Sequence, residues 1–208
     1  GEESGVDCGG SCEAICRSNP RNLIIEWARP FSVGQGVVSA VAYITNPNQE
    51  HFATRVPYIF KFYDAGGILL IEKRGLTDVF PRASFPVFAG TLNIANKVAA
   101  RVLFSFTSGP SWQETDNGEN PLLVREQEFT ENPPRLSATV LNNGLTSFER
   151  VLVTAVLFDQ NDNAFAASET TVEIIGKESS APVVFTWPKS FASPPARILI
   201  YPKAPPAP

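Results

Sequence analysis

The feature of this sequence that most constrains its fold is a long internal repeat. The stretch 44–70 (ITNPNQEHFATRVPYIFKFYDAGGILL) and the stretch 140–165 (VLNNGLTSFERVLVTAVLFDQNDNAF) present the same order of strand, Asn-rich turn, strand, acidic turn and strand. The correspondence extends in both directions, to the further pairs 25–31 with 124–129 and 100–106 with 196–202. The offset is 95–96 residues over the central and downstream pairs and 98–99 over the upstream pair. A nearly constant offset predicts two duplicated units.

Each unit has the residue pattern of β-structure. Runs rich in Val, Ile, Phe and Tyr alternate with polar residues and are separated by Pro, Gly, Asn and Asp clusters, which is typical of an all-β fold. Strands are expected at 37–44, 56–63 and 68–72, with a hairpin turn at 64–67 (Asp-Ala-Gly-Gly). About seven short strands per unit predict two tandem immunoglobulin-like or fibronectin III-like antiparallel β-sandwiches.

The predicted organisation follows the composition along the chain. We expect a cysteine-rich segment at 1–20, one sandwich at 21–110 and a second at 122–203. The polar, Pro- and Gly-containing stretch between them predicts a linker at 111–121, and 204–208 (APPAP) predicts an extended tail.

Composition excludes some classes of partner. The 208 residues carry a net charge of −4 and a pI near 5.1, and Lys and Arg do not cluster with aromatic residues, so nucleic acid is not an expected partner. The longest apolar runs, such as 151–158, are about half the length of a membrane-spanning helix. Because the sequence begins without Met, we read it as a mature or truncated fragment, and any membrane attachment would come from an anchor upstream.

Cys8, Cys12 and Cys16 are the cysteines of this sequence, and all lie near its start. An odd number in so short a segment favours one disulfide together with a partner upstream, in an oxidising compartment. A zinc site is the weaker alternative, because a second cysteine pair is missing, and a free thiol is a third. The neighbouring acids Glu2, Glu3 and Asp7 could also bind calcium through oxygen.

Two short patterns resemble known families. KFYDAGGIL and VLFDQNDNAF resemble the acidic strand-turn pattern of FxLyD-type immunoglobulin-like modules of bacterial surface and secreted proteins, over most of residues 22–203. GEESGVDCGGSCEAIC is similar to an ETGVDCGG-x-C cysteine element of bacterial secreted proteins. The first resemblance implies an extracytoplasmic sandwich and transfers no catalytic residue. The second implies a further cysteine upstream.

The residue motifs that are typical of enzymes are missing from this sequence. His51, the sole histidine, lies in the turn-like NPNQEHF, and a GxSxG nucleophile motif is missing. Asp64 and Asp159 are better explained as turn-forming residues than as paired catalytic carboxylates. We therefore expect no enzyme and no resident cofactor.

Two further features could contact a ligand. Asp159, Asn161 and Asn163 place oxygens at alternate positions, as at the start of a calcium loop, but the expected turn Gly and final Glu are missing; a plain hairpin turn is the main expectation. Trp27 and Trp187 lie in apolar runs and are expected in the core, whereas Trp112, in the polar linker, could be an interdomain plug or an exposed contact.

The sequence thus predicts a non-enzymatic structural or adhesive module, extracellular or attached to the cell envelope. A module that binds carbohydrate or protein through Trp112 or the loops is one alternative. A filament subunit that self-associates through strand edges or the N-terminal segment is another.

Overall fold

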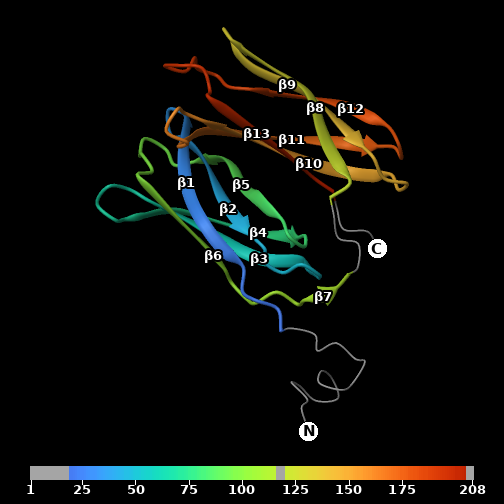
Figure 1. Cartoon of the computed structure of the whole chain (residues 1–208). Helices are drawn as coiled ribbons and strands as arrows, with labels where there is room; N and C mark the ends of the chain where they lie inside the picture. The colour runs from blue at the N-terminus through green and yellow to red at the C-terminus, as the bar shows by residue number, and fades with distance from the viewer. Residues whose placement is uncertain (1–18, 116–119, 205–208) are drawn as a thin grey trace.

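The computed structural model describes residues 19–115 and 120–204, and every regular element in these ranges is a β-strand. All strand pairs are antiparallel, so the predicted all-β antiparallel fold is confirmed (Figure 1). The described residues include no helix that is long and apolar enough to span a membrane. The strands are β1 (Ile24–Gly34), β2 (Val37–Thr45), β3 (His51–Tyr63), β4 (Leu69–Val79), β5 (Ser84–Asn93), β6 (Arg101–Phe106), β7 (Gln113–Glu114), β8 (Leu122–Glu131), β9 (Pro134–Asn142), β10 (Phe148–Phe158), β11 (Ala164–Ile175), β12 (Ser180–Thr186) and β13 (Arg197–Lys203).

The strands form two units with the same sheet topology. In the first unit (β1 to β7) one sheet has the order β1-β2-β5 and the other β4-β3-β6, with β7 pairing the start of β3. In the second unit (β8 to β13) the corresponding orders are β8-β9-β12 and β11-β10-β13. Each strand of the second unit therefore has a counterpart in the first.

Each unit has its own hydrophobic core between its two sheets. Alternate residues of facing strands point inward, as the pleat of a strand requires. The largest fully buried side chains of the first core are Phe60, Phe62, Phe85 and Ile44, and those of the second are Phe185, Leu136, Leu157 and Ile175. The apolar alternation in the sequence therefore supplies two separate β-sandwich cores.

A buried asparagine braces the connection after the second strand of each unit. The Asn46 side-chain amide donates to the carbonyls of His51 (2.9 Å) and Phe80 (2.8 Å). At the equivalent position the Asn142 amide donates to the carbonyls of Thr146 and Gly176, both at 2.8 Å. Because these amides satisfy loop carbonyls that would otherwise lack a partner, they fix the loops at one end of each sandwich.

The acidic turns also match between the units. The Asp64 carboxylate accepts a hydrogen bond from the backbone N–H of Ile68, and the Asp159 carboxylate accepts from Asn163, both at 2.9 Å. Residues in the left-handed region, Gly67 (φ 81°) and Asp162 (φ 59°), complete the two turns. Both aspartates thus serve as turn formers.

The structure differs from expectation in two places. Each unit has six strands rather than about seven, if the two-residue β7 is left aside. In the first unit, the stretch 107–112 that follows β6 has no alternating apolar run from which a further strand could form. His51 is the first residue of β3 and not part of a turn, since it pairs with Glu114 of β7. β7 thereby lies inside the predicted linker 111–121.

Candidate functional site

The two units meet along one pair of sheet faces, which we call the seam. The face of the β1-β2-β5 sheet that points away from the first core lies against the face of the β11-β10-β13 sheet that points away from the second core (Figure 1). Six side chains form its buried apolar centre, each at most 6% exposed: Phe31, Val41, Val156, Phe158, Ala164 and Ala167. β2 and β10 are therefore buried on both faces, one toward a core and the other toward the seam.

Aromatic rings and one arginine extend the seam beyond its centre. Trp27 stacks on Tyr43 with ring centroids 5.6 Å apart and meets Phe158 edge-on at 6.3 Å. Arg29 of β1 donates from Nη1 to the backbone carbonyl of Ala164 at 3.0 Å. The rings bury apolar area across the seam, while the guanidinium satisfies a carbonyl of the other unit.

At the end of the seam a lysine of the second unit enters the first. The Lys203 ammonium donates a hydrogen bond to the Thr77 hydroxyl of β4 and lies 5.3 Å from the centre of the Phe85 ring of β5. Burial lowers the pKa of Lys203 to about 8, against the attraction of Asp78 and Glu169, which raises it. A desolvated cation with a hydroxyl partner and two nearby carboxylates fixes the C-terminal end of β13 on the first unit.

Glu169 of β11 belongs to the same buried polar group. Its carboxylate accepts a hydrogen bond from the Thr154 hydroxyl at 2.9 Å. Burial raises the pKa of Glu169, and the Thr154 bond and the Lys203 charge oppose that shift. Opposite charges therefore lie together in a junction whose two charged side chains are both partly buried.

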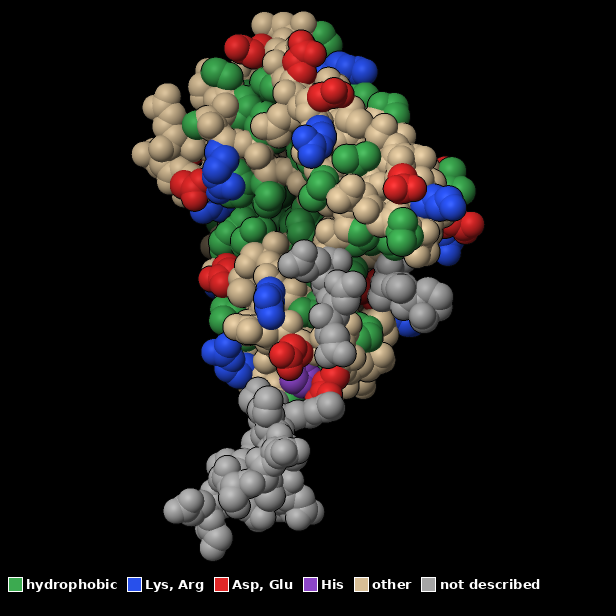
Figure 2. Space-filling view, turned by 45° about the vertical axis from the view of Figure 1, so that its right-hand side comes forward, with side chains coloured by type: hydrophobic (Ala, Val, Ile, Leu, Met, Phe, Trp, Pro, Cys, Tyr) green, Lys and Arg blue, Asp and Glu red, His purple; other side chains and the backbone are tan. Residues whose placement is uncertain are grey.

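The equivalent faces on the outside of the pair carry charged and polar side chains among exposed leucines such as Leu103. Where the seam has Val156 beside Ala167, the first unit has Lys61 beside Glu72, with an ion pair of 3.5 Å between Nζ and Oε1. The seam residues Val41, Tyr43 and Trp27 correspond to Ser137, Thr139 and Arg125 in the second unit. The view in Figure 2 shows charged side chains of both signs spread over the surface, with green hydrophobic side chains between them. The outside faces are thus more polar than the seam, in the direction expected for the terminal repeats of a stacked array.

In the structure, the oxygens of Asp159 and Asn163 in the predicted calcium loop accept hydrogen bonds from other protein groups. One Asp159 oxygen accepts the backbone N–H groups of Asn161 and Asn163, and these bonds are the main cause that lowers the Asp159 pKa. The Asn163 side-chain oxygen faces the Arg29 guanidinium at 3.4 Å. In 19–115 and 120–204, no three His, Cys, Asp or Glu side chains are grouped to hold a metal. The calcium hypothesis for this loop gains no support.

The tryptophans lie in different environments. Trp112 packs against the core of the first unit and meets His51 edge-on, with ring centroids 6.4 Å apart. Trp187 is 8% exposed within the second core, whereas Trp27 belongs to the seam. Cys8, Cys12, Cys16, Glu2, Glu3 and Asp7 lie outside the described residues, and the predictions for them stay predictions.

Sequence reasoning missed the seam, although a signal for it was present. VVSAVAYI of β2 and VLVTAVLF of β10 are apolar at nearly every position, whereas RLSATVLN of β9 alternates. A strand that loses its alternation is buried on both faces. Lys203 left no such signal, because its burial depends on long-range packing.

Comparisons with known proteins give little information on the family or activity of this chain. No family model and no curated protein matches this sequence. Among solved structures, the crystal structure of red sea bream transglutaminase is similar, with a TM-score of 0.29 and 12% sequence identity. That match covers 90% of this chain, which spans 29% of the length of the transglutaminase chain. A similarity this weak assigns no activity.

Proposed function

We propose that this chain is a non-enzymatic structural module of a bacterial cell surface, in which two immunoglobulin-like units are locked into one stiff scaffold. The seam is the observation that carries the proposal. Separating the units would expose Val41 and Val156, which are both 0% exposed, at roughly 1.5–3 kcal/mol for each side chain. It would also uncover the Lys203 junction.

The charged side chains on the outside faces favour a single two-unit particle over a growing stack. If a further unit packed on this face, it would bury the Lys61–Glu72 ion pair. Both charges would lose their contact with water, which is costly. A filament built by repeating the seam is therefore disfavoured. The chain acts as a spacer or platform whose loops are held at fixed positions.

The location outside the cytoplasm rests on the sequence. The resemblance to surface-protein modules and the cluster of Cys8, Cys12 and Cys16 support it, since disulfides persist in oxidising compartments. Surface labelling of intact cells of the source organism, with non-reducing mass spectrometry of the cysteine peptide, tests this part. A protein found only inside cells with all thiols reduced would contradict it.

Small-angle X-ray scattering of the full chain tests the stiff scaffold. We expect one particle shape that is independent of protein concentration. The double variant Val156→Lys/Ala167→Glu copies the outer-face pair into the seam and should increase the radius of gyration and its spread. Lys61→Val/Glu72→Ala is the matched control on the outer face and should leave the particle rigid. A flexible wild-type particle, or growth with concentration, would refute the scaffold.

A further inference from the structure

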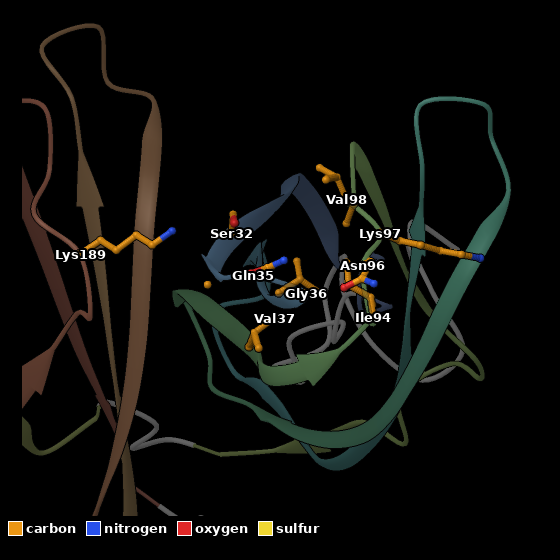
Figure 3. A pocket seen from close by; sticks show the side chains of 12 residues that line it. Ser32, Gln35, Gly36, Val37, Ile94, Asn96, Lys97, Val98 and Lys189 are labelled. Atoms are coloured by element: carbon orange, nitrogen blue, oxygen red, sulfur yellow. The ribbon is translucent and has the colours of Figure 1, made fainter.

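A cleft opens at one end of the first unit, close to the second. The β1–β2 hairpin at 34–36 and the β5–β6 connection at 94–99 form two of its walls, and Lys189 of the second unit forms another (Figure 3). Its volume is about 220 Å³. That is below the range of roughly 300–1,000 Å³ for drug-sized ligands, so the cleft suits a smaller molecule.

One hydrogen bond between the two loops and one within the β5–β6 connection fix the walls of this cleft. The backbone N–H of Ile94 donates to the carbonyl of Gly36 at 2.8 Å, and the N–H of Ala95 donates to the Asn93 side chain at 2.8 Å. Gly36 has φ 67°, and a Cβ there would lie 1.7 Å from the Ala95 carbonyl oxygen. The close approach of the loops therefore requires glycine, and the walls are formed before any ligand binds.

The lining combines a cation, free polar groups and an apolar surface. Across 19–115 and 120–204, the side chains of Ser32, Gln35, Asn96 and Lys189 make no hydrogen bond or ion pair. Figure 3 shows the Lys189 ammonium directed from the second unit toward Ser32, whereas the Lys97 side chain runs away from the other lining residues. None of the lining residues is acidic, and the apolar ones are Val37, Val38, Ile94, Val98 and Ala99.

The second unit provides an internal comparison. Its equivalent cleft, between the β8–β9 hairpin and the β12–β13 connection, holds about 40 Å³. There Phe191 fills the space and stacks on Phe129, with ring centroids 6.3 Å apart, and meets Trp187 at 5.6 Å. Ala95 is the counterpart of Phe191 in the first unit. The first cleft is open because this position lacks a large side chain.

We infer that the open cleft binds a single acidic sugar ring, of the hexuronate class. Lys189 is placed to pair with the carboxylate, which charge-assisted hydrogen bonds favour. Gln35 and Asn96 can donate to and accept from ring hydroxyls. The exposed Val98 side chain, 74% exposed, offers an apolar surface to the C–H face of the ring. This inference goes beyond the scaffold function but rests on the fixed placement of the two units, because Lys189 belongs to the second unit; a flexible particle in scattering would refute the scaffold, whereas a rigid particle without glucuronate shifts would refute the site alone.

Titration of the ¹⁵N-labelled full chain with sodium glucuronate, followed by amide chemical shifts, tests this inference. Glucose and acetate, tested separately, supply the neutral ring and the carboxylate alone. We expect saturable shifts confined to residues of the two cleft loops and around Lys189, at millimolar affinity, with glucuronate binding more tightly than either fragment. Lys189→Ala should weaken glucuronate binding about tenfold, the usual effect of losing one charge-assisted bond, while Lys97→Ala, whose side chain points away, should change it less than about twofold.

Three kinds of result would overturn the site. The first is the lack of saturable shifts up to about 50 mM glucuronate, well above a millimolar dissociation constant. The second is equal binding of glucuronate and glucose, which would remove the role of the charge, or equal binding of glucuronate and acetate, which would remove the role of the ring. The third is equal loss in the Lys189→Ala and Lys97→Ala variants, which would indicate nonspecific attraction.

Discussion

Trp27 of the first unit meets Phe158 of the second edge-on, with ring centroids 6.3 Å apart. Phe158 also lies under the Arg197 guanidinium, at 3.5 Å from its ring centre. The Phe158 ring is therefore covered by the Trp27 indole of the first unit and by the Arg197 guanidinium of the second unit. This contact closes the seam beside its apolar centre and makes the relative placement of the two units depend on side chains 131 positions apart in the sequence.

Replacing a seam residue by its outer-face counterpart should destabilise the protein. Val41→Ser copies Ser137 and removes a side chain that is 0% exposed, leaving a small cavity and a buried hydroxyl. We expect a loss of about 2–3 kcal/mol in the free energy of unfolding by urea. The reverse variant, Ser137→Val, lies on the outer face and should change stability by less than about 0.5 kcal/mol. Equal effects of the two variants would contradict the seam.

The asparagine braces should be among the costliest polar side chains to remove. Asn142 is 0% exposed, and its oxygen also accepts the backbone N–H of Gly144 at 2.9 Å. Asn142→Ala leaves two carbonyls and this N–H without their partner, so we expect a loss of about 2–4 kcal/mol in urea unfolding. Asn143→Ala, at the exposed neighbouring residue, should change stability by less than about 0.5 kcal/mol. A loss below about 1 kcal/mol for Asn142→Ala would argue against the brace.

Most of the fold could be predicted from the sequence, because it depends on local patterns. Alternating apolar residues indicated the strands, and Asp64 with the following glycines indicated a hairpin turn. The repeat predicts that the strands of its two halves follow in the same order. The start of β3 was harder to predict, since His51 is extended only through its pairing with β7, more than 60 residues away.

The contacts between the units could be predicted only in part. Loss of alternation in β2 and β10 indicates burial on both faces, yet it does not say which faces meet. The burial of Lys203 against Thr77 and the opening of the cleft at Ala95 both result from packing between distant segments. Side-chain type alone assigns a lysine to the surface, so sequence reasoning overlooked both.

Substitution by alanine should change the stability of the protein more at Gly36 than at Gly34. Gly36→Ala places a Cβ 1.7 Å from the Ala95 carbonyl at φ 67°, whereas a Cβ on Gly34 meets nothing within 4 Å. We expect Gly36→Ala to cost about 2 kcal/mol or more in urea unfolding. Gly34→Ala should be within about 1 kcal/mol of the wild type, on either side. If Gly36→Ala proved as stable as Gly34→Ala, the close approach of the two cleft loops would be wrong.

The buried lysine should make the stability of the protein depend on alkaline pH. The folded-state pKa of Lys203 is about 8, below the ordinary value of 10.5. Between these two values the unfolded chain binds more protons than the folded one, so the free energy of unfolding rises with pH. The groups that face the ammonium are Thr77 and Asp78 of β4, Phe85 of β5 and Glu169 of β11. Burial raises the pKa of Tyr58 to about 12 from 10.0, so a decrease should follow above about pH 10.

Urea unfolding in the presence of a thiol reductant, at about pH 7.5 and about pH 9.5, measures this effect. From the Lys203 shift we expect the wild type to gain roughly 1–3 kcal/mol between the two conditions, at 1.36 kcal/mol per pKa unit. Lys203→Met should lose most of this gain, because its side chain does not titrate. Lys177→Met, at an exposed position, leaves Lys203 in place and should keep the wild-type gain. A gain of the same size in Lys203→Met would show that the ammonium is not the group whose proton is lost on folding.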